Sequence, residues 1–109
     1  MWLIISFDLP TVTPKQRKVY TVFRKNLLKD GFFMHQFSVY VRHCASFQHA
    51  ETYINRVEKY IPKEGHVSIM QFTDKQFSMI KNYWGYGRSQ PERFGQLTMF
   101  TEQTELQIK

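Results

Sequence analysis

The 109-residue sequence contains a single cysteine, Cys44, so the fold cannot depend on an internal disulfide framework. A zinc cluster of Cys and His ligands is also excluded, because it needs more thiols than the chain has. No stretch approaches the roughly 20 apolar residues of a membrane span. No basic leader precedes the N-terminal apolar run, so we expect no signal peptide. These absences predict a soluble cytoplasmic protein with no membrane partner.

Acidic residues are scarce in the first part of the chain. Residues 1–45 hold seven basic and two acidic side chains, whereas residues 46–109 hold eight basic and seven acidic ones. Most of the net charge of +6 therefore comes from the first part, mainly from one predicted helix. A solvated helix normally mixes both signs, so this asymmetry favours a polyanionic partner, and nucleic acid in particular.

Aromatic residues, in contrast, make up 17% of the chain, which argues against disorder. The length suffices for one small two-layer domain and not for two. We predict a folded domain over residues 1–84 and a flexible connector over 85–96, where Gly and Pro accumulate. A short strand at 97–101 and a polar tail at 102–109 complete the expected organisation.

Periodicity and capping residues predict the regular elements. Residues 2–8 predict a strand buried on both faces, because the apolar run hardly alternates. Thr13 and Pro14 predict the start of a helix, and Gly31 predicts its end. We also expect a helix over 46–61, a strand over 67–72 and a short helix over 74–80 with Thr73 as its cap.

The first predicted helix combines an apolar stripe with many cations. Val19, Phe23 and Leu27 recur every four residues, and Tyr20 and Val22 widen this stripe to a core-facing width. The rest of the circumference carries the basic residues Lys15, Arg17, Lys18, Arg24, Lys25 and Lys29.

Residues 32–42 are rich in β-formers and alternate from Gln36 onward. One predicted face carries Phe37, Val39 and Val41, and the other carries Ser38, Tyr40 and Arg42. One long strand and a hairpin broken near residues 36–37 both fit, since no Gly or Pro marks a break.

This order of elements is typical of an α+β fold with two helices on one face of an antiparallel sheet. The other face would be bare, and Tyr40 with other apolar groups would form a patch there. A second copy of the chain would cover that patch. The late strand, with Leu97, Met99 and Phe100, is placed to extend the sheet of the partner.

Asp8 ends the first predicted strand and is the only acid in residues 1–29. A lone carboxylate before a basic helix suggests metal-assisted chemistry or phosphate handling. The alternative is that Asp8 only forms the turn after the strand.

Four segments together resemble the CRISPR-associated Cas-two family, the small subunits of the spacer-acquisition machinery. They are residues 5–10 (ISFDLP), 17–32 (RKVYTVFRKNLLKDGF), 36–40 (QFSVY) and 73–76 (TDKQ). The resemblance runs from residue 1 to about residue 100, and it is closest to the type II members.

This resemblance implies a ferredoxin-like βαββαβ fold and a homodimer in which the last strand is exchanged. It implies that the dimer bridges integrase dimers and holds duplex DNA with short single-stranded ends. It also implies a metal-dependent endonuclease acting on single-stranded RNA or on DNA. In that activity Asp8 of each protomer would help to hold one shared Mg²⁺, which suits carboxylate and phosphate oxygens.

The basic residues fit contacts to a nucleic-acid backbone without base readout. The predicted set is Arg17, Lys18, Arg24 and Lys25 of the first helix, extended by Arg42, Arg88 and Arg93. An RNA-recognition module is disfavoured, because no Gly-rich strand motif with stacking aromatics is seen. A small metabolic regulator would need no basic helix.

One departure from the family concerns catalysis. Nuclease members often have an Arg just before the position of Gln36, where this chain has Met34 and His35. His35 is either a substitute proton carrier or a structural residue. A purely structural nucleic-acid-binding adaptor, with Asp8 as a turn former, therefore remains the alternative function.

Overall fold

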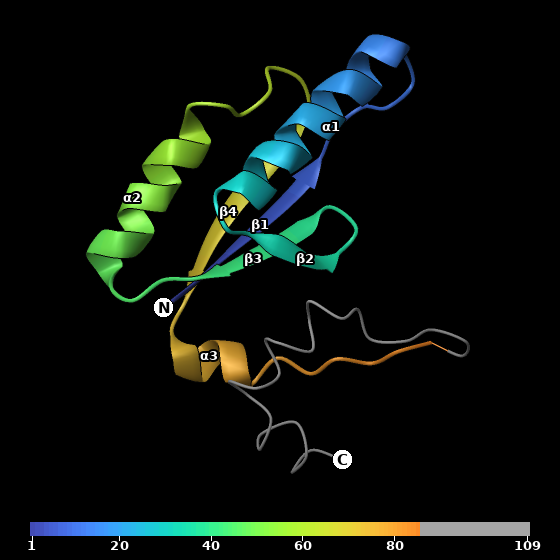
Figure 1. Ribbon diagram of the computed structural model, residues 1–109. Helices are drawn as coiled ribbons and strands as arrows, with labels where there is room; N and C mark the ends of the chain where they lie inside the picture. Colours follow the sequence, from blue (N-terminus) through green and yellow to red (C-terminus); the bar gives the residue numbers. More distant parts are fainter. Residues whose placement is uncertain (86–109) are drawn as a thin grey trace.

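The computed structural model describes residues 1–85. Its strands are β1 (Trp2–Asp8), β2 (Phe33–Gln36), β3 (Val39–His43) and β4 (His66–Phe72), and its helices are α1 (Pro14–Lys29), α2 (Phe47–Glu58) and α3 (Asp74–Ser78). The strands form one sheet in the order β2-β3-β1-β4, and each neighbouring pair is antiparallel. The helices α1 and α2 cover one face, and α3 lies on the other side (Figure 1). This is the predicted α+β, ferredoxin-like arrangement.

The central strand β1 is apolar on both sides, as its sequence predicts. Leu3, Ile5 and Phe7 lie beneath α1 and α2, on what we call the α1–α2 face. The residues between them point to the opposite side, which we call the α3 face, where Trp2 and Ile4 are buried. Because β1 pairs with both β3 and β4, it has no free edge.

Both ends of α1 form where the sequence predicts them. The Thr13 hydroxyl accepts a hydrogen bond from the Gln16 amide at 3.1 Å, and the Gln16 side chain accepts one from the Thr13 amide. This reciprocal pair satisfies two of the amides that a helix start leaves without partners. After α1, Gly31 adopts a φ of 87°, a left-handed conformation that favours glycine.

The apolar stripe of α1 is narrower than its periodicity predicts. Phe23 and Leu27 are fully buried against the sheet, and the Phe23 ring meets the Phe7 ring edge-on at 5.0 Å. Val19 and Val22, in contrast, are 42% and 48% exposed. They lie on the side of α1 that faces the connection between α2 and β4 across an open groove.

The segment from Phe33 to His43 is a hairpin and not one long strand. Residues 37 and 38 form its turn, in which Ser38 has a φ of 61°, and a bulge interrupts the pairing between Met34 and Gln36. Phe37 is in the turn and 87% exposed, so it is not part of the predicted alternating face.

Tyr40 lies on the opposite face from the one predicted. In β3 it pairs with Ile5 of β1, and opposite residues of an antiparallel pair share a face. Its ring is therefore 1% exposed among the residues of the α1–α2 face. The alternation of β3 separates its residues correctly but does not show which set the helices cover. The expectation that Tyr40 forms a dimer contact on a bare face is wrong, because the single chain already buries it.

The α3 face is also not bare over its whole extent. The Phe77 ring of α3 stacks on the Trp2 ring with centroids 4.0 Å apart and an interplanar angle of 9°. Together with Ile4 and Val41 these rings form a second, smaller core. Partly buried side chains surround it, namely Phe33, Val39, Met70, Phe72 and Ile80.

Several expectations lie outside residues 1–85. They include all but the first residue of the connector at 85–96, the strand at 97–101 and the tail at 102–109. Arg88, Arg93 and the dimer contacts of Leu97, Met99 and Phe100 lie there too. Within the described part of the chain, none of the helices has the length and apolar character needed to cross a membrane.

Candidate functional site

Asp8 is the last residue of β1 and projects onto the α3 face. Alternation places it there, because its neighbour Phe7 packs under α1 and contacts the rings of Phe23 and Tyr40. The Asp8 side chain is exposed, and within residues 1–85 it makes no hydrogen bond or ion pair. The turn-former interpretation predicts a bond from this side chain to the backbone that follows, and within residues 1–85 Asp8 makes no such bond. Asp8 is thus an accessible carboxylate held by an anchored strand.

Asp30, the other acidic residue in the first 45, has a different role. Asp30 is 8% exposed and accepts a 2.6 Å bond from Arg56 Nη2 and a 2.9 Å bond from the Tyr60 hydroxyl. These contacts tie the end of α1 to α2 and the connection that follows it. Burial, followed by the bond to Asp30, raises the pKa of the Tyr60 phenol. Asp30 therefore has a structural role.

Residues distant in sequence meet Asp8 at the end of β1. His66 is its partner in the β1–β4 ladder, and two residues further in, on the same face, Ser6 is paired with Ser68. We call these four residues the polar end of the α3 face. Sequence reasoning misses His66, because no local pattern reveals which residue of β4 lies opposite Asp8.

No larger ligand cluster accompanies Asp8 in this part of the molecule. Among residues 1–85, three or more His, Cys, Asp or Glu side chains do not come together anywhere as a metal-binding group. His35 lies in β2, and burial lowers the pKa of its imidazole. Cys44 is fully buried in the core, and burial raises the pKa of its thiol.

The basic residues of α1 that are predicted to contact nucleic acid fall into two groups, arginines that make hydrogen bonds within residues 1–85 and lysines that do not. Arg17 Nη1 donates to the carbonyls of Val12 at 2.8 Å and Thr11 at 3.2 Å, which closes the loop before α1. Arg24 is half-buried, and its Nε donates to the Tyr40 hydroxyl. Lys18 and Lys25 are seven residues apart and thus on one side of the helix. Both are exposed, and neither makes such a bond to another residue of the described part of the chain.

Arg42 occupies a different position from the surface contact predicted for it. Its Nε donates to the Asp30 carbonyl at 2.9 Å, and its Nη1 donates to the His43 carbonyl at 2.7 Å. The guanidinium also lies over the Tyr53 ring at 3.8 Å from the centroid. These contacts hold the α1–β2 connection against α2, so Arg42 serves packing in this structure.

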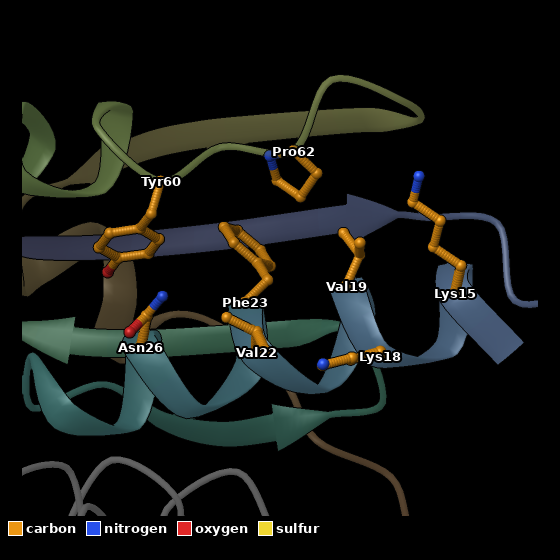
Figure 2. Close-up of a pocket in the computed structure, with 8 residues that line it drawn as sticks. All are labelled: Lys15, Lys18, Val19, Val22, Phe23, Asn26, Tyr60 and Pro62. Carbon is orange, nitrogen blue, oxygen red and sulfur yellow. The ribbon is translucent and has the colours of Figure 1, made fainter.

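A groove runs beside α1, between that helix and the connection from α2 to β4 (Figure 2). Its volume is about 380 Å³, and Val19, Val22 and Pro62 form apolar parts of its wall. Lys15 and Lys18 border it (Figure 2). The aliphatic stems of lysines can lie along such apolar surface while the ammonium groups stay in water. The exposed valines thus belong to the cationic side of α1.

Comparison with known proteins agrees with this arrangement. Residues 1–80 match the family model described as CRISPR associated protein Cas2. The chain belongs to the Cas2 family. The match ends just after α3, so it covers the sheet, all three helices and Asp8.

Curated Cas2 relatives extend over most of the chain. The CRISPR-associated endoribonuclease Cas2 of Parvibaculum lavamentivorans is 53% identical over 88 residues, which are 81% of this chain and 87% of that protein. The protein of the same name from Flavobacterium psychrophilum is 48% identical over 78% of this chain and 74% of its own length. That of Paracidovorax avenae is 43% identical over 85% of this chain and 86% of its own.

Proposed function

We propose that this Cas2 protein is a homodimeric spacer-acquisition subunit that binds duplex DNA through the outer side of α1 and bridges integrase dimers. The observation that best supports this proposal is that α1 contains six basic residues and no acidic one, and that Lys18 and Lys25 are exposed and make no hydrogen bond or ion pair within residues 1–85. Contacts of this kind follow the phosphate backbone and read no bases. DNA with short single-stranded ends is the proposed ligand of the dimer.

Lys18 and Lys25 are the residues with which to test DNA binding. Arg17 and Arg24 make internal hydrogen bonds, so their reversal would disturb the fold as well as the surface. We expect Lys18→Glu with Lys25→Glu to weaken duplex binding equally for all sequences. The salt dependence should flatten by about one slope unit for each phosphate that the variant no longer neutralises.

A matched control reverses two exposed lysines elsewhere, Lys59 beside α2 and Lys75 in α3. The Lys59→Glu with Lys75→Glu protein has the same net charge as the test protein. If both double variants lose affinity alike, binding follows net charge and not α1. Unchanged affinity in the test variant would transfer the site to other residues, with Arg88 and Arg93 next in order.

We further propose that Asp8 supports metal-dependent cleavage of RNA or DNA. The names of the relatives call those proteins endoribonucleases. An exposed carboxylate that makes no hydrogen bond or ion pair among residues 1–85 fits Mg²⁺, which takes one or two carboxylates and keeps most of its waters. When bound, the ion would polarise a phosphate and activate a water. The role of Asp8 is to hold the ion at the polar end, and in the proposed dimer Asp8 of each protomer would share it.

Two carboxylates that approach each other would repel unless a cation or a proton lay between them. Dimerisation and metal binding are therefore coupled in this proposal. Mg²⁺ should strengthen the dimer of the unmodified protein and leave the dimer of Asp8→Asn unaffected, as measured by sedimentation across a Mg²⁺ titration. A dimer constant independent of Mg²⁺ in both proteins would rule out a shared ion.

A further inference from the structure

His66 is the cross-strand neighbour of Asp8. The two residues are the terminal pair of the β1–β4 ladder, and both side chains are exposed. Directly opposed residues of an antiparallel pair have Cβ atoms about 4.5–5.5 Å apart and project from the same face. The imidazole of His66 and the carboxylate of Asp8 therefore project side by side from the polar end.

The backbone fixes this neighbour relationship through Gly65. Gly65 has a φ of 90°, and a Cβ at this position would come within 2.6 Å of the Asp8 carbonyl oxygen and 2.8 Å of a Leu9 methyl carbon. Only glycine allows the chain to enter β4 so close to the end of β1. This contact places His66 opposite Asp8 at the first position of the strand.

The surroundings leave room for a ligand. On this face the next pair of the β1–β4 ladder inward is Ser6 with Ser68, two small polar residues, and Ile4 with Met70 follows only beyond them. On the other side of β1, away from His66, Val39 of β3 lies opposite Ser6. A cation bound by Asp8 could thus be approached by the His66 imidazole without displacing a packed side chain.

We propose that His66 is a second protein ligand of the cation bound by Asp8, and that it shifts metal preference from Mg²⁺ towards transition metals such as Mn²⁺. The inference rests on the proposed metal role of Asp8 and adds a residue to that site. Mg²⁺ prefers oxygen donors, whereas imidazole nitrogen suits first-row transition metals. An imidazole added to the carboxylate oxygens of the site should therefore discriminate between these ions.

The test measures metal binding by the full-length protein without any nucleic acid. Mn²⁺ affinity is obtained from electron paramagnetic resonance, Mg²⁺ affinity from competition, and imidazole ligation from ¹⁴N modulation of the bound Mn²⁺ signal. We expect His66→Gln to lose the ¹⁴N modulation and to bind Mn²⁺ at least about tenfold more weakly, with Mg²⁺ affinity unchanged. Asp8→Asn should weaken binding of both ions.

His49→Gln is the matched control, because it removes an imidazole from α2 and leaves the polar end intact. Circular dichroism and thermal unfolding verify that each variant is folded. Unchanged Mn²⁺ affinity and ¹⁴N modulation in His66→Gln, with both affinities reduced in Asp8→Asn, would overturn the role of His66 alone. Unchanged affinities in Asp8→Asn would overturn the metal role of Asp8 itself and this inference with it.

Discussion

The Nε of Arg24 donates a hydrogen bond of 2.6 Å to the hydroxyl of Tyr40, which links α1 to β3 beneath the helices. This bond gives the buried hydroxyl a charged donor, the stronger kind of partner. It also explains how a tyrosine can occupy a position that is only 1% exposed. Arg24 is consequently part of the fold as well as of the cationic helix.

Removing this hydroxyl should destabilise the protein. We expect Tyr40→Phe to lower the free energy of unfolding by about 1–3 kcal/mol, because the variant cannot form this hydrogen bond to a charged group inside the structure. Urea unfolding measures the change, and Tyr83→Phe is the control, since Tyr83 is 82% exposed. Equal stabilities of the two variants would show that the Arg24 bond contributes little.

The stability of the protein should fall as the pH drops below the ordinary pKa of histidine. Burial lowers the pKa of His35 from 6.5 in the folded state, so the unfolded chain takes up this proton more readily. The contribution of His35 is complete above pH 6.5 and is lost as the pH falls through the lower folded-state pKa. Urea unfolding of the unmodified protein and of His35→Gln, at several values between about pH 5 and about pH 7.5, measures this. A slope that is the same in both proteins would assign the effect to other groups.

The proposed dimer provides a third prediction. The partly exposed apolar side chains of the α3 face and the predicted strand at 97–101 suggest a second copy as the partner. Sedimentation should show about twice the chain mass of 13.2 kDa. A chain ending at Gln96 should dimerise more weakly than a chain ending at Thr101, which lacks only the polar tail. A stable monomer of the full chain at micromolar concentration would contradict the dimer.

Asp8 separates the two activities of the proposed function. We expect Asp8→Asn to lose Mg²⁺-dependent cleavage of RNA or DNA, because the amide is a poorer metal ligand than the carboxylate. The same variant should still support insertion of a short duplex when it is reconstituted with the integrase, since bridging depends on α1. Insertion is the informative measurement, because trace ribonuclease can mimic weak cleavage. Loss of insertion with folding and DNA binding intact would make Asp8 essential to acquisition.

If neither the unmodified protein nor Asp8→Asn cleaves RNA or DNA in the presence of Mg²⁺, the protein is better described as a nucleic-acid-binding adaptor without catalysis. The control for contamination is to purify the unmodified protein and Asp8→Asn separately, in parallel and by the same procedure. Cleavage that is equal in both would be assigned to a contaminant and would remove the nuclease part of the proposal.

Local signals predict the elements of this fold well. The cap at Thr13, the glycine at 31 and the continuous apolar run of β1 are each encoded within a few residues, and the structure confirms all three. The cap at Thr73 is confirmed in the same way, with its hydroxyl accepting from the Gln76 amide.

The features that sequence reasoning misses depend on contacts between distant segments. Which face of β3 lies under the helices is decided by its pairing with β1, so Tyr40 could not be placed from its own strand. Val22 remains half exposed because it borders the open groove between α1 and the connection from α2 to β4, which its periodicity cannot show. The opposition of His66 and Asp8 follows from the register between β1 and β4, which no short motif encodes.

The all-cationic surface of α1 also bears on the energetics of the free protein. Six like charges on one short helix repel one another, and no carboxylate of that helix offsets them. Added salt screens this repulsion, and a bound polyanion neutralises it. The ligand-free protein should therefore be most fragile in dilute buffer and should melt at higher temperature both in salt and on DNA. Binding of a polyanion such as DNA should therefore stabilise the folded protein, because it removes the repulsion among the cations of α1.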